Sequence, residues 1–209
     1  MTTTDFDSRA ETWDDDPAKV ERAQAVADEI VARVPLSRTM RALEYGCGTG
    51  LLSFMLRERL GDITLADVSQ GMLDVAARKI KAAGDASMRA VQLDFFADPV
   101  PAKAFDVIYS LMTLHHIPDT VGIFERFHSA LASPGYLCIA DLDAEDGSFH
   151  GAGFDGHLGF DRGELAAEAR RAGFSSVQFS TAYRITKAVG DEMRTFPVFL
   201  MVARSGGGA

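Results

Sequence analysis

Short, nearly continuous apolar runs alternate along this chain with longer segments whose apolar residues recur every three or four positions. The apolar runs predict buried strands, and the three-to-four spacing predicts helices packed on a core. Five strands are expected to alternate with helices before a final strand pair, which predicts an α/β fold: a mostly parallel sheet covered by helices on both faces. The expected strands are 40–45, 63–67, 88–93, 105–110, 136–140, 177–180 and 197–202.

Residues that cap helices support this division of the chain. Asp16 followed by Pro17 predicts a helix start, because the carboxylate can accept from free backbone N–H groups and proline suits the first helical position. Ser69 and Asp119 predict two further starts, and Gly84 predicts a helix end. The expected helices are 17–34, 49–60, 70–83, 120–131 and 162–172.

A glycine-rich turn joins the first central strand to the next helix. Gly46, Gly48 and Gly50 follow the apolar run 42–45. Glycine permits positive φ and lets the backbone approach a ligand closely. The helix that follows offers free N–H groups and a partial positive charge. We expect a ligand with polar or anionic groups on this turn.

The ligand is expected to be a nucleoside. Ligands of parallel sheets bind at the carboxyl ends of the strands, which here are 44–50, 67–69, 94–96, 110–116 and the residues from 141 onward. Asp67 ends the second strand, where its carboxylate can accept from both hydroxyls of a ribose. The glycine spacing is G-x-G-x-G, and Leu51 stands beyond it, so the turn departs from the dinucleotide fingerprint and disfavours NAD.

Composition narrows the class of partner. The chain has 209 residues, a net charge of −9 and a pI of about 5.0, which argues against nucleic acid or an anionic membrane surface as a partner. The start is polar, with no apolar signal segment, and no stretch has the length of a membrane helix. Cys47 and Cys138 are interpreted as thiols. We expect a cytoplasmic protein.

A series of motifs, taken in order, resembles that of the class I S-adenosylmethionine-dependent methyltransferases. The resemblance spans about residues 15–204 and implies a Rossmann-like, doubly wound sheet of seven strands, with the antiparallel last strand inserted between strands five and six. It also implies S-adenosyl-L-methionine as cofactor. The motifs are Glu44-x-Gly46-x-Gly48-x-Gly50 with Asp67 and Asp94, the segment 105–117, Leu131-x-x-Pro134-Gly135, and Ala172-Gly173-Phe174.

The resemblance implies a role for each matched position. Glu44 would hold the amino group of the cofactor, Asp67 its ribose and Asp94 its adenine amino group. Cys47 would be a small residue within the glycine turn. The full set of cofactor-binding candidates is Glu44, Gly46, Cys47, Gly48, Asp67, Val68, Asp94, Phe95, Ser110 and Leu111.

Methyl transfer from a sulfonium requires mainly alignment and exclusion of water, and a general base only for weakly acidic acceptors. His115 and His116, just after the fourth strand, are the candidate catalytic bases. Residues 141–160 combine carboxylates with His150 and His157, but their spacing matches no known metal pattern, so we expect a solvated acidic loop and no metal.

Three segments are expected: a lid at 1–16, which would use Phe6 and Trp13 to cover the cofactor, a methyltransferase domain at 17–204 and a flexible tail at 205–209. The predicted function is transfer of a methyl group to an O, N or C atom of a small molecule; the acidic charge mildly favours a neutral or cationic acceptor. An NAD-type oxidoreductase and a non-catalytic S-adenosylmethionine-binding regulatory module stay open as alternatives. The sequence does not indicate the oligomeric state.

Overall fold

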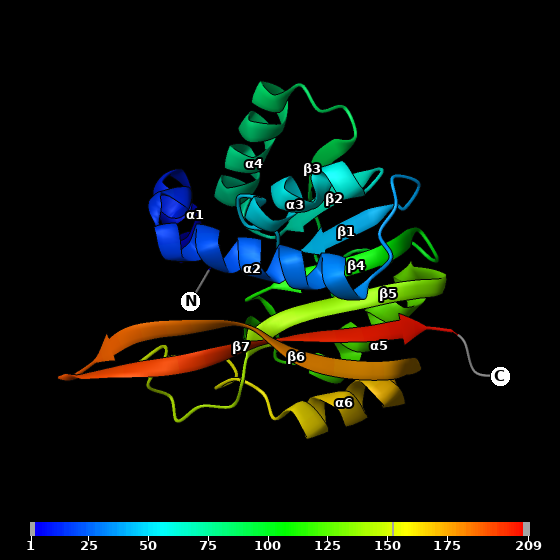
Figure 1. The fold of residues 1–209 in the computed structure, drawn as a ribbon. Coiled ribbons are helices and arrows are strands. Elements are labelled where there is room, and N and C mark those ends of the chain that lie inside the picture. Colours follow the sequence, from blue (N-terminus) through cyan, green and yellow to red (C-terminus); the bar gives the residue numbers. More distant parts are fainter. Residues whose placement is uncertain (1–2, 152, 207–209) are drawn as a thin grey trace.

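A computed structural model describes residues 3–151 and 153–206 and shows one seven-stranded sheet with helices on both faces (Figure 1). The strand order is β3-β2-β1-β4-β5-β7-β6, and β7 runs antiparallel to both of its neighbours. The predicted fold class and the predicted place of the last strand are confirmed. The strands are β1 Ala42–Tyr45, β2 Ile63–Asp67, β3 Met88–Gln92, β4 Phe105–Leu111, β5 Leu131–Leu142, β6 Phe174–Val189 and β7 Glu192–Ser205.

Two groups of helices cover the two faces of the sheet. The α-helices are α1 Thr3–Arg9, α2 Pro17–Arg33, α3 Leu51–Leu56, α4 Gln70–Ala83, α5 Thr120–Ala130 and α6 Arg162–Arg171; short 3-10 turns span Ala10–Asp15, Arg57–Arg59 and Leu114–His116. Helices α2, α3 and α4 pack on one apolar cluster through Val26, Leu52 and Leu73. Helices α5 and α6 pack on the other through Phe124 and Leu165.

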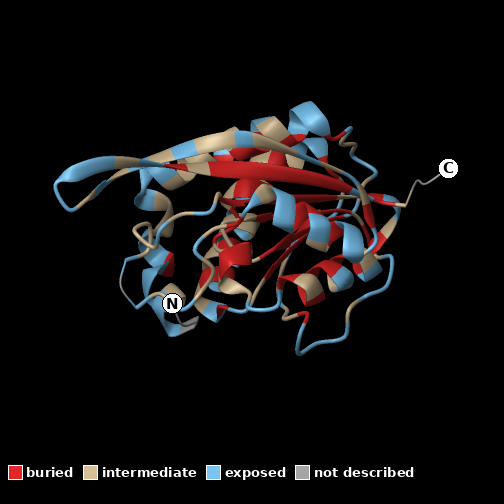
Figure 2. Ribbon diagram, turned by 90° about the horizontal axis from the view of Figure 1, so that it is seen from below, coloured by how far each residue is buried: buried red, intermediate tan, exposed pale blue. Residues whose placement is uncertain are grey.

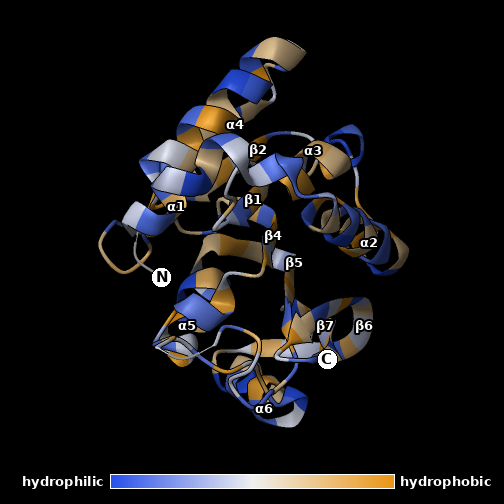
Figure 3. Cartoon of the chain, turned by 90° about the vertical axis from the view of Figure 1, so that its left-hand side faces the viewer, coloured by the Kyte–Doolittle hydropathy of each residue, from blue (hydrophilic) through white to orange (hydrophobic). Residues whose placement is uncertain are grey.

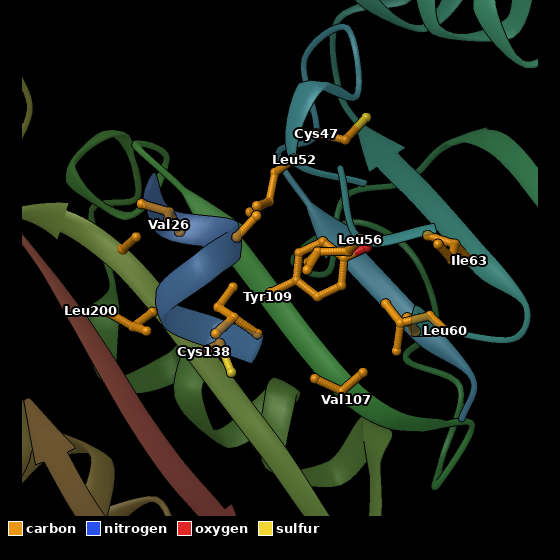
Figure 4. Close-up of a cluster of buried hydrophobic side chains, with 14 of the residues drawn as sticks. Val26, Cys47, Leu52, Leu56, Leu60, Ile63, Val107, Tyr109, Cys138 and Leu200 are labelled. Carbon is orange, nitrogen blue, oxygen red and sulfur yellow. The ribbon is translucent and has the colours of Figure 1, made fainter. Parts of the chain in front are cut away.

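The sheet is buried between these helices because its central strands are apolar on both sides. Figure 4 shows how Val26 and Leu52 approach the sheet over Tyr109 and Cys138. At about 25 cal/mol per Å² of apolar area removed from water, such clusters supply the main driving force for folding. The rigid sheet fixes where each strand ends, and therefore where the loops at its carboxyl ends meet.

The predicted caps form as expected. The carboxylates of Asp16 and Asp119 and the hydroxyl of Ser69 accept from the first turns of α2, α5 and α4, and Gly84 takes the left-handed conformation after α4. The helix expected at 49–60 is shorter: α3 covers only Leu51–Leu56 before a 3-10 turn.

The last two strands are much longer than the sequence predicted. β6 and β7 pair from Phe174 with Ser205 out to Val189 with Glu192, so the segment expected to connect them is itself paired strand. Figure 2 shows this hairpin running beyond the buried centre of the molecule, its tip exposed. β7 also includes Ser205, the first residue of the expected tail; residues 207–209 lie outside the described part of the chain.

Across residues 3–151 and 153–206, no helix has both the length and the apolar character that a membrane span requires.

Candidate functional site

A cavity of about 630 Å³ opens at the carboxyl ends of the central strands, which is the size typical of small-molecule sites. Figure 3 views the molecule from this side, with α1 and α4 on one flank and α2 on the other. The glycine turn, the ends of β2, β3 and β4, the N-terminal segment, α2 and β6 all contribute lining residues. The expected position of the site is therefore where the cavity lies.

The glycine turn presents bare backbone to this cavity. Gly46 and Gly48 have φ of +69° and +52°, which disfavour any residue with a Cβ. A Cβ on Gly46 would come within 2.2 Å of Thr113, so this glycine allows two loops to touch. A Cβ on Gly48 would meet only Met72 Sδ at 3.9 Å and Trp13 Nε1 at 4.0 Å, so Gly48 faces open space that a ligand can fill.

Asp67 anchors the loop after β2 and faces the cavity. Its carboxylate accepts from the backbone N–H of Gly48 at 2.7 Å and from that of Ser69 at 2.9 Å. Burial is the largest influence on its pKa, which is raised. Each oxygen has a second lone pair, so the carboxylate can still accept from two hydroxyls. Val68, beside it, is exposed and lines the cavity.

Asp94 also lines the cavity, but its neighbour Phe95 does not, and the expected contact of Phe95 is wrong. Phe95 is 1% exposed and packs against Tyr45 and Phe127 within a buried apolar cluster. Phe96 lines the cavity instead, with the Arg126 guanidinium 4.4 Å from its ring centre. The chain turns directly after β3, so adjacent side chains point in opposite directions.

Ser110 is likewise misplaced by the sequence prediction. It is buried, and its hydroxyl donates to the carbonyl oxygen of Tyr45 at 2.8 Å, so it joins β4 to β1 beneath the cavity. Leu111 does line the cavity, as expected, together with Met112 and Thr113. Ser110 therefore acts on the shape of the strand ends and not on a ligand.

Glu44 lies at the base of the cavity, 2% exposed. One of its oxygens accepts from the backbone N–H of Ser53 at 3.1 Å and from the Ser53 hydroxyl, which also contacts Tyr109 Oη at 2.8 Å. Burial raises the pKa of Glu44 to about 8. A cation brought to this carboxyl would favour its ionised form.

Cys47 lines the cavity as a small residue of the glycine turn. Burial holds the pKa of its thiol well above the ordinary value, and its sulfur lies 3.3 Å from the Gly48 carbonyl oxygen. A thiol that resists ionisation is a poor nucleophile, so the cysteine fits the packing role expected for it.

His115 forms a buried pair with Asp141, the residue in the penultimate position of β5. Its Nδ1 lies 2.7 Å from Asp141 Oδ1, and its backbone N–H donates to Oδ2 at 3.2 Å. Because the carboxylate holds the Nδ1 proton, the lone pair of Nε2 is left to accept another. Sequence analysis placed Asp141 in a solvated acidic loop; the structure instead buries it completely.

His116 and His150 complete a group of three imidazoles. The His115 ring centre is 4.1 Å from that of His116 and 4.8 Å from that of His150, and all three residues line the cavity. Burial is the largest cause, and the coupling to the neighbouring His115 ring the second, that lowers the pKa of both His116 and His150 to about 4. Both are therefore neutral near pH 7 and able to accept a proton.

The N-terminal segment contributes aromatic side chains to the wall of the cavity, and its role as a lid stays a prediction. Phe6 and Trp13 both line the cavity, and Phe6 packs edge-on against His116. Asp7 fastens the segment to α4 by accepting from the Ser69 hydroxyl at 2.6 Å and from the Gly71 N–H at 2.9 Å.

A second attachment lies nearer the glycine turn. Asp14 accepts from Thr49 at 2.5 Å and pairs with Lys79 at 2.6 Å. The segment is thus held at both ends over the space above Gly48.

Sequence analysis missed the cationic residues of the cavity. Arg9, Lys19, Arg22 and Lys187 line it, coming from α1, α2 and β6. Only the apolar residues of α2 were considered in the sequence. Lys19 and Arg22 are three positions apart and therefore lie side by side on the helix, which was the signal that could have found them. Lys187 could not have been found, since β6 was expected to end before it.

The acidic loop after β5 is held by basic residues. Asp143 pairs with Arg162 at 2.7 Å, and Asp146 pairs with Arg194 of β7 at 2.9 Å. The Phe149 carbonyl oxygen accepts from Lys187. Within the described residues, no three or more His, Cys, Asp or Glu side chains are grouped to hold a metal ion.

Comparison with known proteins shows that this chain is similar to methyltransferases. Residues 42–135 match the family profile described as a methyltransferase domain. The chain is 28% identical over 139 residues to 27-O-demethylrifamycin SV methyltransferase of Amycolatopsis mediterranei, covering 62% of this chain and 49% of that protein. The chain spans about half the length of the curated relatives it matches.

Two solved structures share the fold at low identity. Phosphoethanolamine N-methyltransferase 2 of Haemonchus contortus, in complex with phosphomonomethylethanolamine and S-adenosylhomocysteine, superposes with a TM-score of 0.73 at 18% identity, over 87% of this chain and 52% of that one. The 4+2 cyclase SpnF superposes with a TM-score of 0.72 at 18% identity, over 88% and 81%. Since these two proteins are named for different reactions, the shared fold does not by itself identify a reaction.

Proposed function

Because this chain belongs to the class I S-adenosylmethionine-dependent methyltransferases, we propose that it transfers a methyl group from S-adenosylmethionine to an oxygen, nitrogen or carbon atom of a small molecule. One observation carries the proposal: the cavity joins two kinds of surface. At one part, the bare backbone at Gly48 and the carboxylate of Asp67 suit a nucleoside; at another, three imidazoles line the wall, where we place the acceptor.

The residues present fit the cofactor. Asp67 keeps two unused lone pairs for ribose hydroxyls, and Asp94, whose Oδ1 accepts from Phe96 N–H at 2.8 Å, can accept from an exocyclic amino group. Glu44 can face the ammonium group of an amino-acid chain. Val68 and Phe96 offer apolar surface for a planar base. We assign these four contacts to the chain as part of the proposal.

The cofactor, when bound, supplies an activated methyl group, so the chain mainly has to align an acceptor and keep water away. Phe6 and Trp13 cover the cavity and Leu111 lines it. His115 is the proposed general base: Asp141 holds its Nδ1 proton, and its Nε2 would take the proton of an acceptor O–H or N–H. Asp141 is then a positioning residue. His116, neutral near pH 7, is the second candidate base.

Turnover tests the proposal. S-adenosylmethionine is incubated with the protein and a panel of phenols, amines and carboxylic acids, and S-adenosylhomocysteine is measured. We expect at least one acceptor to raise its formation above the acceptor-free rate. Tight binding of S-adenosylhomocysteine without turnover on any acceptor would favour the non-catalytic module instead.

The base assignment makes a separate prediction. His115→Ala should lower the rate with the responsive acceptor about 100-fold or more, since general bases contribute roughly 10²–10⁴-fold, while S-adenosylhomocysteine affinity changes less than about twofold. Asp141→Asn should shift the acid limb of the pH–rate profile, which a purely structural role would not do. Wild-type rates in both His115→Ala and His116→Ala would leave alignment alone as the mechanism.

A further inference from the structure

Helix α2 places one arginine at the cavity for which no ion pair is found among the described residues. Arg22 lines the cavity and is largely buried, and its Nε is shielded from water with no hydrogen-bond partner among the described residues. Asp16, Tyr183 and Asp141 act on the guanidinium through space, without a hydrogen bond to it among the described residues. Burial is the largest influence on its pKa, which is lowered.

The neighbouring cations differ from Arg22 because each has a partner. Lys19, one turn earlier on α2, donates to the Trp13 carbonyl oxygen and pairs with Asp16 at 3.5 Å. Lys187 donates to the carbonyl oxygen of Phe149. An unpaired buried charge is costly to a fold, so a guanidinium kept in this state beside a ligand-sized cavity indicates an anion supplied from outside the chain.

We propose that Arg22 binds the carboxylate of a small molecule held in this cavity. A guanidinium presents its donors as a planar fork that matches the two oxygens of a carboxylate. Two sources of a carboxylate follow from the proposed function, on which this inference rests: the amino-acid chain of the cofactor, or an acid group on the methyl acceptor. The second would reverse the preference for a neutral or cationic acceptor that overall charge suggested.

Calorimetry with two nucleosides separates these sources. S-adenosylhomocysteine carries the amino-acid carboxylate, and 5′-methylthioadenosine lacks it. If the cofactor is the source, Arg22→Met should weaken S-adenosylhomocysteine about 10- to 100-fold, the loss expected for a charge-assisted hydrogen bond, and leave 5′-methylthioadenosine unchanged. Arg22→Lys should retain part of the affinity, since a lysine keeps the charge without the fork.

A thermal-shift arm tests the other source. Acetate, malonate and benzoate at millimolar concentration are added to the protein saturated with S-adenosylhomocysteine. If the acceptor is the source, at least one acid should raise the Tm of the wild type and not that of Arg22→Met, while S-adenosylhomocysteine affinity stays the same.

Two controls separate a loss of ligand binding from a loss of folding. Without ligand, Arg22→Met should be as stable as wild type or more so, because it removes an unpaired buried charge. Arg33→Met makes the same change on α2 at a residue paired with Glu29 and should bind as wild type. Equal S-adenosylhomocysteine affinity in wild type and Arg22→Met, with no Arg22-dependent response to any acid, overturns the proposal. A wild type that binds no S-adenosylhomocysteine contradicts the proposed function instead.

Discussion

At the scale of single residues, the cavity concentrates groups whose protonation the fold has altered. Glu44 is held neutral near pH 7 by burial, and burial is also the main cause that holds His116 and His150 neutral. Such groups gather where a fold is built for a ligand or a reaction. All three groups lie at positions that the sequence had pointed to, Glu44 and His116 as the preferred candidates and His150 as a less favoured one.

Glu44 gives a prediction about pH and stability. Its pKa is about 8 in the folded state against 4.5 in the unfolded state. The stability that the protonated Glu44 contributes is therefore complete below pH 4.5 and is lost as the pH rises toward 8. Ligand-free Glu44→Gln should therefore become more stable relative to wild type as the pH rises over that window. The gain in unfolding free energy is at most about 1.4 kcal/mol per pH unit and appears as a higher Tm. Thermal unfolding between about pH 5 and 9 measures this. The exposed Glu58→Gln is the control. A Tm difference between wild type and Glu44→Gln that stays constant across this pH range would contradict the assignment.

The residue scale also shows where prediction from sequence fails. Asp67 and the glycines were identified because a strand end and a turn are local signals. Phe95 and Phe96 are adjacent, and only the turn after β3 decides which one faces the cavity. Asp141 is buried against His115, which lies far away in sequence, and Arg22 is buried without a partner, so local sequence patterns could not predict either environment.

At the scale of elements, the N-terminal segment and the β6–β7 hairpin form the part of the site that is hardest to predict from the sequence. The caps of α2, α4 and α5 were correct because each depends on residues within one turn. The hairpin was underestimated because its outer half alternates half-buried and exposed residues and resembles a loop in composition. Its length matters, since only the outer half brings Lys187 and Arg194 to the loop over the cavity.

The lid makes a kinetic prediction. Asp7→Ala removes the acceptor for Ser69 Oγ and Gly71 N–H, so S-adenosylhomocysteine should dissociate several-fold faster. Trp13 is the chain's only tryptophan and lines the cavity, so stopped-flow protein fluorescence reports the release. Asp15→Ala, an exposed change in the same segment, should leave the rate alone. The pKa of Asp7 is lowered by those hydrogen bonds, so lowering the pH through that pKa should loosen the wild-type lid in the same way.

The hairpin makes a prediction about local order. Arg194→Ala removes the contacts to Asp146 and to the Ser148 hydroxyl at 2.6 Å. Hydrogen exchange in residues 144–151 should then speed up, while the central strands keep their protection. Arg184→Ala, at an exposed position of β6, is the matched control. Unchanged exchange in Arg194→Ala would mean that other contacts fix this loop.

At the scale of the whole molecule, an acidic chain folds around a cavity with cations of its own. The net charge of −9 describes the outer surface and says little about the ligand. The position of the site followed from the alternation of strands and helices, because parallel sheets bind ligands at one edge, and the strand order followed from the family resemblance. The acceptor did not follow, since its surroundings come from the lid, α2 and β6 together.

The central claim is that this cavity binds the nucleoside of S-adenosylmethionine through Asp67. Calorimetric titration of S-adenosylhomocysteine and of NADH into wild type and Asp67→Ala tests it most directly, with the exposed Asp74→Ala as control. We expect one S-adenosylhomocysteine to bind per chain, no NADH binding, and a loss of about 1–3 kcal/mol of binding free energy in Asp67→Ala. NADH binding in preference to S-adenosylhomocysteine, or equal S-adenosylhomocysteine affinity in Asp67→Ala and wild type, would contradict it.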